Sequence, residues 1–169
     1  MCGRPKLMKQ VGDLCIDLFG DKLAHFVWVD SYEIIVNMEL HDILEQSELT
    51  GFNFRNVKID LWERDYPLEE LPAPTLYQLV VKGNGGSIFP QNISHSLATC
   101  RDCGYIDWEP LDQIKVDKSQ WDGTDIFNLT EFPGFTLVTE KFCTFLTSNN
   151  INEYRVIPSE EFSMKAKPF

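Results

Sequence analysis

The sequence lacks the features that mark membrane-spanning proteins, secreted proteins and many enzymes. No apolar run approaches the roughly 20 residues that a membrane-spanning helix needs, and the first residues lack the apolar stretch of a secretory signal. A His-Glu-x-x-His, Gly-x-Ser-x-Gly or kinase signature does not occur, and the three histidines, His25, His41 and His95, are scattered along the chain. These absences predict a cytoplasmic protein that is not an enzyme and has no membrane partner.

Cysteine is scarce and its count is odd, which argues against a disulfide framework. The chain has 5 cysteines in 169 residues. This number favours a reducing compartment, and metal chemistry over disulfide bonds. Cys15 and Cys143 stand alone in the sequence, and we expect them to be buried among apolar side chains.

Basic residues are few compared with acidic ones. The 15 lysines and arginines face 26 aspartates and glutamates, so the formal net charge is −11. Phosphate backbones and anionic lipids repel such a chain, whereas a basic protein attracts it. The charge therefore predicts no nucleic-acid partner, and it is equally consistent with a role in solubility alone.

A glycine-rich run, Lys82-Gly83-Asn84-Gly85-Gly86, does not form a phosphate loop. The Gly-Lys-Ser/Thr ending is absent and no helix is expected directly after it. Its composition instead predicts a turn between a strand over 76–81 and a returning hairpin strand over 87–89.

The most informative stretch is a cysteine knuckle, Cys100-Arg101-Asp102-Cys103-Gly104. Two cysteines at this spacing can direct both sulfurs at one metal ion. The start of the chain, Met1-Cys2-Gly3-Arg4-Pro5, reads like the end of a second knuckle. If the two meet, Cys2, Cys100 and Cys103 would ligate a structural zinc ion. The fourth ligand would be a residue before Cys2, a water or His95. The alternative is that Cys100 and Cys103 are free thiols.

A strand–strand–helix–strand pattern occurs twice in the chain. In the first copy, strands are expected over 26–29 and 32–36, followed by a helix capped by Asn37 and a strand from Phe52. In the second copy, strands are expected over 126–129 and 135–138, followed by a helix capped by Thr139 and a strand over 154–157. An offset of 102 aligns the two caps, and it also aligns the apolar faces Leu40, Ile43, Leu44 and Phe142, Phe145, Leu146. The shared order and register favour a duplication.

We therefore expect an α+β fold in a single domain, 1–169. Its two pseudo-duplicated strand–strand–helix–strand halves, 1–57 and 100–158, would pack around a shared core and meet at the cysteine site. A further strand is expected over 14–18. Residues 58–99 would connect the halves, with an extended, acidic and proline-rich segment over 61–74 before the hairpin. Residues 158–169 read as a loosely held tail.

The motifs of the second half resemble those of the double-CXXCG motif family of bacterial proteins. Cys2-Gly3-Arg4-Pro5 looks like the tail of the first CXXCG of that family, although its first cysteine is missing here. Four segments carry the resemblance: Thr99-Cys100-Arg101-Asp102-Cys103-Gly104, Asp125-Ile126-Phe127-Asn128, Thr136-Leu137-Val138-Thr139-Glu140-Lys141-Phe142 and Tyr154-Arg155-Val156-Ile157-Pro158.

This family includes immunity proteins of swarming-inhibition toxin systems in myxobacteria and resembles immunity partners of polymorphic toxins. The resemblance implies a cytoplasmic protein that binds and neutralises one cognate toxin domain, and the acidic charge would steer it to a basic toxin. The alternative is a zinc-knuckle adaptor or nucleic-acid-associated protein. For toxin contact we expect aromatic and acidic residues of the connector, because such side chains are common interface anchors. These residues are Trp62, Glu63, Asp65, Tyr66, Glu69 and Glu70.

Overall fold

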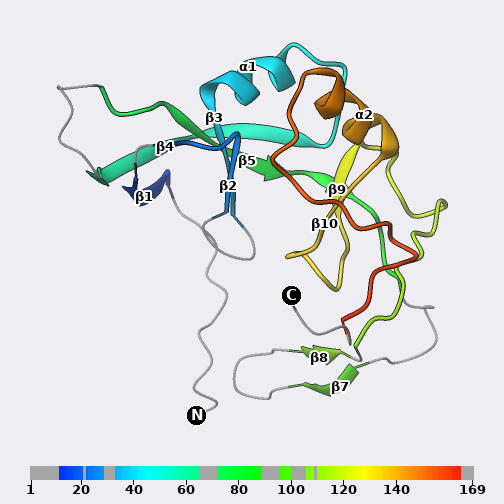
Figure 1. Cartoon of the computed structure of the whole chain (residues 1–169). Coiled ribbons are helices and arrows are strands. Elements are labelled where there is room, and N and C mark those ends of the chain that lie inside the picture. The colour runs from blue at the N-terminus through cyan, green and yellow to red at the C-terminus, as the bar shows by residue number, and fades with distance from the viewer. Residues whose placement is uncertain are drawn as a thin grey trace.

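The computed structural model describes residues 12–20, 22–28, 33–64, 72–88, 96–99, 106–108 and 110–164. Within these ranges the protein is a mixed α+β structure made mostly of strands, with two short helices (Figure 1). The predicted α+β class is therefore confirmed at this level. The elements are β1 (Leu14–Phe19), β2 (Phe26–Trp28), β3 (Ile34–Asn37), α1 (Met38–Glu45), β4 (Phe52–Glu63), β5 (Leu76–Val81), β6 (Gly83–Asn84), β7 (Ser96–Thr99), β8 (Ile106–Trp108), β9 (Ile126–Asn128), β10 (Thr136–Val138) and α2 (Glu140–Ser148).

The larger sheet has five strands in the order β1-β4-β5-β3-β2. β4 pairs in parallel with β1, and the other neighbours are antiparallel. β5 begins and ends at the residues predicted from its apolar pattern, and β3 lies between β5 and β2. Apolar clusters cover both faces of β3, with Ile34 and Val36 in one and Ile35 in another, so all three residues are at most 4% exposed.

The smaller sheets consist of β10-β9-β6 and of β7-β8. β9 and β10 form an antiparallel hairpin that leads directly into α2, as β2 and β3 lead into α1. Both predicted helix caps are present: Asn37 Oδ1 accepts the Leu40 N–H, and Thr139 Oγ1 accepts the Phe142 N–H. Each helix therefore begins where the sequence places its cap.

One hydrophobic core joins the two hairpin–helix units. Its buried members include Val36, Leu40 and Leu44 from the first unit and Phe142 and Leu146 from the second. Leu49 and Ile151, which follow the two helices, also lie in this cluster. Burial of apolar side chains from both units in one cluster stabilises their mutual packing.

Three local predictions prove wrong. Residues 154–157 form no strand, although their neighbour Ile151 is buried. Gly83 and Asn84 form a strand that pairs in parallel with β9, so the expected turn and its returning strand at 87–88 are absent. The tail is also held as far as Met164, because its backbone bonds with the segment 111–114.

The connector is shorter than expected, because β4 continues to Glu63. Among the described residues, no helix has the length and apolar character needed to cross a membrane.

Candidate protein-binding surface

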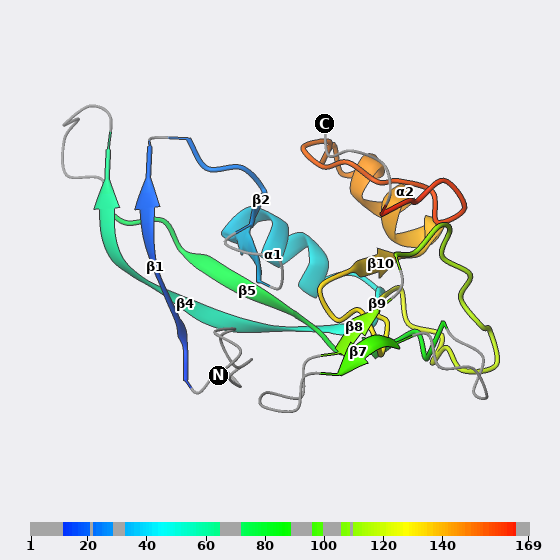
Figure 2. The same cartoon turned by 90° about the horizontal axis from the view of Figure 1, so that it is seen from below.

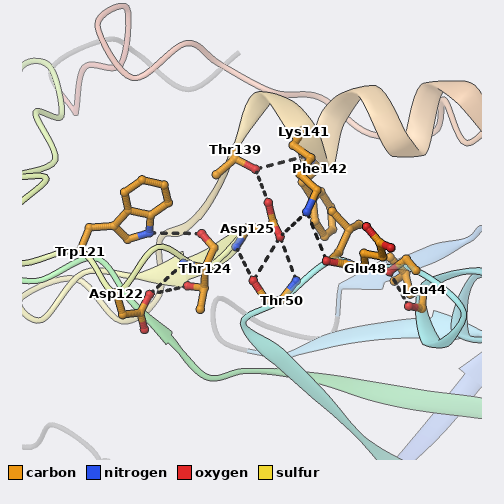
Figure 3. A network of polar contacts seen from close by, with 12 residues as sticks. Leu44, Glu48, Thr50, Trp121, Asp122, Thr124, Asp125, Thr139, Lys141 and Phe142 are labelled. Atoms are coloured by element: carbon orange, nitrogen blue, oxygen red, sulfur yellow. Dashed lines mark hydrogen bonds and ion pairs between the residues drawn. The ribbon is translucent and has the colours of Figure 1, made fainter.

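A buried carboxylate, Asp125, joins the second unit to the first (Figure 3). It directly precedes β9. Its Oδ2 accepts hydrogen bonds from Thr50 N at 3.0 Å and Thr50 Oγ1 at 3.1 Å, on the segment that follows α1. Its Oδ1 accepts from Thr139 Oγ1 at 3.1 Å, and Lys141 Nζ lies 3.3 Å from Oδ2. Burial alone would raise the pKa of Asp125, but these hydrogen bonds outweigh it and hold the pKa below its ordinary value.

The backbone beside Asp125 is also tightly packed. The carbonyl of Thr50 accepts the N–H groups of both Asp125 and Ile126. Gly51 has a φ of +100°, and a Cβ at this position would lie 2.1 Å from the Ile126 carbonyl oxygen. Since a side chain would clash there, only glycine permits this approach. The Asp125 network is therefore a structural joint between the units.

A second joint also connects the two units, but here the residue before the first hairpin contacts the segment after the second helix. His25, directly before β2, donates its backbone N–H to Glu153 Oε2 at 3.0 Å, and its Nδ1 lies 3.0 Å from the same oxygen. Glu153 belongs to the segment after α2. The backbone hydrogen bond from His25 lowers the pKa of Glu153. Each unit thus uses the residue before its hairpin to contact the segment after the other unit's helix.

The part of the molecule away from α2 is a ribbon of two parallel strands, β1 and β4 (Figure 2). β5 pairs with β4 only over Phe52–Asn56, so residues 57–63 of β4 have β1 as their strand partner. The register shifts between Ile16 and Asp17, because Ile16 pairs with Ile59 and Asp17 pairs with Leu61. Asp60 is the extra residue in this bulge.

The bulge decides which side chains face the core. Without it, the alternation that buries Ile59 would also turn Leu61 inward. With it, Trp62 faces the inner side of the ribbon. There its Nε1 donates to the Gly20 carbonyl at 2.9 Å, and the Arg64 guanidinium lies 4.7 Å from its ring centre.

The outer face of the ribbon carries an exposed apolar pair, Phe19 and Leu61. Their exposed fractions are 65% and 52%. Asp17, which pairs with Leu61, and Glu63, which pairs with Phe19, are both exposed on this face. The neighbouring cation, Lys58, is held by Asp60. We call Asp17, Phe19, Leu61 and Glu63 the ribbon patch. An apolar centre with an acidic rim suits a protein surface that is apolar and basic.

The structure separates the predicted contact residues. Glu63 lies in the ribbon patch, whereas Trp62 is half-buried on the opposite face and holds the ribbon together. Asp65, Tyr66, Glu69 and Glu70 lie outside the described residues. Sequence reasoning missed Phe19 and Leu61. Strand alternation could have placed Phe19 with Asp17, but the bulge hides the orientation of Leu61.

The predicted zinc ligands, Cys2, Cys100 and Cys103, and the alternative ligand His95, also lie outside the described residues. In the part of the chain that is described, no group of three or more His, Cys, Asp or Glu residues is placed to hold a metal ion. Cys15 is exposed on β1, which contradicts the predicted burial, because it shares the outer face with Asp17. Cys143 is half-buried, and burial raises the pKa of its thiol.

A mostly apolar cleft of about 1040 Å³ lies beside the second unit. β9, β10, α2 and the segment 154–160 line it, and β2, β3 and β5 each contribute one residue to the lining. Its lining residues include Phe26, Leu79, Thr136, Val138, Phe142 and Tyr154. The rings of Phe26 and Tyr154 meet edge to face at 6.3 Å. Its size and apolar lining are those of a binding cleft.

Comparison with known proteins identifies no relative: no family model matches the chain, and no curated protein matches it.

Proposed function

We propose that this protein is an immunity protein that binds a basic bacterial toxin domain in the cytoplasm and neutralises it. The observation that carries the proposal is the ribbon patch. Phe19 and Leu61 lie diagonally across the outer face of the ribbon, and a partner that covered both would remove this apolar surface from water. The acidic rim specifies the charge of that partner.

The charge of the whole chain supports the same partner. A net charge of −11 accelerates association with a basic domain and leaves the apolar pair to provide the lifetime of the complex. The resemblance to the double-CXXCG immunity proteins points in the same direction. Binding, and not chemistry, would be the means of inhibition.

The decisive experiment identifies the toxin and then tests the patch. The tagged chain is used to capture its partner from an extract of the source bacterium. The captured domain is then expressed with and without the chain. We expect growth arrest by the domain alone and relief by the chain. A captured domain that is harmless to cells, or one that the chain fails to neutralise, contradicts the proposal.

Variants of the ribbon patch then locate the interface. Phe19→Ser with Leu61→Ser should weaken the complex by about 30-fold or more, the effect of losing a hot spot of about 2 kcal/mol. Met38→Ser is the matched control, because Met38 is 53% exposed but lies on α1. The melting temperature should remain unchanged in both the double variant and the control, because the substituted side chains are exposed. If the double variant binds like the control, the patch is not the interface.

We further propose that the two hairpin–helix units arose by duplication. The equivalent caps Asn37 and Thr139 support this, as do the two reciprocal joints made by His25 and Asp125.

In this proposal the knuckle cysteines hold a structural zinc ion between the halves. Metal analysis of the purified protein should give one zinc per chain, and Cys100→Ser with Cys103→Ser should remove it. Metal-free wild-type protein with unchanged stability would contradict the zinc proposal.

A further inference from the structure

The cleft occupies the position that β5 fills in the first unit. There, β3 has β2 on one side and β5 on the other, and β4 follows α1 and pairs with the far side of β5. In the second unit, β10 has β9 on one side, and no strand among the described residues pairs with its other side. The segment after α2, which corresponds to β4, forms no strand. The cleft lies between these two elements.

The backbone of β10 presents its hydrogen-bonding groups to this cleft. Thr139 N–H donates to the Asp125 carbonyl at 2.9 Å, so positions 139 and 125 form a hydrogen-bonded pair. Because such pairs alternate along an antiparallel ladder, Leu137 bonds to β9 while Thr136 and Val138 direct their N–H and C=O groups to the free edge. The described residues offer these four groups no partner.

The first unit shows how such an edge is filled. Asn37 N–H donates to the His25 carbonyl at 3.2 Å, so the same alternation directs Ile34 and Val36 away from β2. These two residues pair with Leu79 and Tyr77 of β5. The offset of 102 places Thr136 and Val138 at the positions of Ile34 and Val36. An added strand would therefore run antiparallel to β10, beneath Phe142 of α2.

We infer that the cleft binds an extended segment of the toxin, which pairs with the free edge of β10 as a strand antiparallel to it. Its side chains alternate in the manner of β5, with apolar residues directed at the core. The chain supplies a strand of this kind once, to β3, and the second unit therefore accepts one from its partner. The inference that the toxin supplies this strand rests on the proposed function, whereas the capacity of the cleft to accept a strand does not.

The first test uses a synthetic peptide with the sequence of residues 74–83, Pro-Thr-Leu-Tyr-Gln-Leu-Val-Val-Lys-Gly, added to the intact protein. Amide hydrogen exchange is followed by NMR. We expect exchange at Thr136 and Val138 to slow by about tenfold or more, and exchange at Leu137 to stay unchanged because it is already bonded to β9. If the protein does not bind the peptide at a concentration of about 1 mM, the inference is overturned. A dissociation constant of this size corresponds to a binding free energy of about 4 kcal/mol. Binding that protects other amides instead also overturns it.

Modified peptides and one protein variant sharpen the test. N-methylation at the peptide positions of Tyr77 and Leu79 removes the donors aimed at β10, and binding should be lost. N-methylation at the positions of Gln78 and Val80 leaves those donors intact, and pairing with β10 should persist. In the protein, Thr136→Pro should weaken peptide binding by about tenfold, because it removes one outward N–H that the native sheet does not use. Thr136→Val, which retains that N–H, is the matched control.

The protein without its partner provides a separate check on which molecule supplies the added strand. If the amides of Thr136 and Val138 are protected at high protein concentration and the chain sediments as a dimer, a second copy fills the cleft and the toxin is not the donor. If the peptide binds but the toxin complex leaves both amides unprotected, the toxin binds elsewhere and the inference about it is wrong. Loss of toxin neutralisation with intact peptide binding would contradict the proposed function alone.

Discussion

The two hairpin–helix units begin alike and end differently. Each has an antiparallel hairpin, a polar cap and a short helix whose apolar face enters the same core. In the first unit, β3 is fully enclosed between two strands, whereas in the second unit β10 is half-buried along its length. Val36 and Val138 are equivalent and alike, but the strand neighbours differ and Thr136 stands where the first unit has Ile34. An enclosed strand serves the core, and a strand with a free edge is available to a partner.

The largest expected difference between the units lies in their central strands. Ile35→Ala should lower the free energy of unfolding by about 2–5 kcal/mol, because Ile35 is fully buried. Leu137→Ala, at the equivalent position, should cost about 1–2 kcal/mol because Leu137 is half-buried. Urea denaturation with both variants measures the two losses. Equal losses would show that β10 is as enclosed in solution as β3, which would contradict the comparison.

The two joints between the units should also differ in strength. Asp125→Ala should destabilise the protein by about 1–3 kcal/mol, because it leaves the partly buried donors of Thr50 and Thr139 without their buried acceptor. Glu153→Ala should destabilise the protein much less than Asp125→Ala, since the Glu153 side chain is 54% exposed. Thermal denaturation of both variants is the measurement. A larger loss for Glu153→Ala would mean that the His25 joint holds the units together.

If the units are related as proposed, the capping hydrogen bond itself should contribute about equally to stability at Asn37 and at Thr139. Asn37→Ala and Thr139→Ala should each cost about 1 kcal/mol, the usual effect of losing a cap. Thr139→Ala should lose somewhat more, because Thr139 also donates to Asp125. The double variant Asp125→Asn with Thr139→Ala isolates that coupling by a double-mutant cycle. Additive losses would indicate that the Thr139 hydroxyl acts through the cap alone.

The smallest effect should appear in the pH dependence of stability. The folded-state pKa of Asp125 is lowered, so its contribution is fully present above the pKa of the unfolded carboxyl, and is lost as the pH falls through the folded-state value. Asp125→Asn should therefore flatten the loss of stability below about pH 4, near the ordinary value of this side chain. Glu153→Gln is the comparison, because its pKa is also lowered although it is exposed. An unchanged acid limb in Asp125→Asn would show that other carboxyls govern acid unfolding.

The sequence predicted the elements whose determinants are local. Asn37 and Thr139 mark both helix starts because a side-chain oxygen before an apolar helical face is a local signal. Leu76–Val81 is a mostly apolar run bounded by Pro74 and Gly83, so its limits could be predicted closely. The α+β class follows from these elements.

The remaining features depend on neighbours that a sequence does not reveal. Gly83 and Asn84 form a strand only because β9 lies beside them. Residues 154–157 have strand-like composition, but no described strand pairs with them. The orientation of Trp62 depends on one bulge residue, Asp60, and so the ribbon patch could not be predicted.

The bulge at Asp60 also bears on how this protein can change over generations. It keeps Ile59 and Trp62 on the inner face and leaves Leu61 on the outer face. The inner face is therefore constrained by packing, whereas the outer face is not. Substitutions at Phe19, Leu61 or Glu63 change the outer surface of the ribbon while the inner side is untouched, and exposed substitutions of this kind cost little stability. The exposed face of the ribbon can therefore change in sequence from one generation to the next while the fold stays the same.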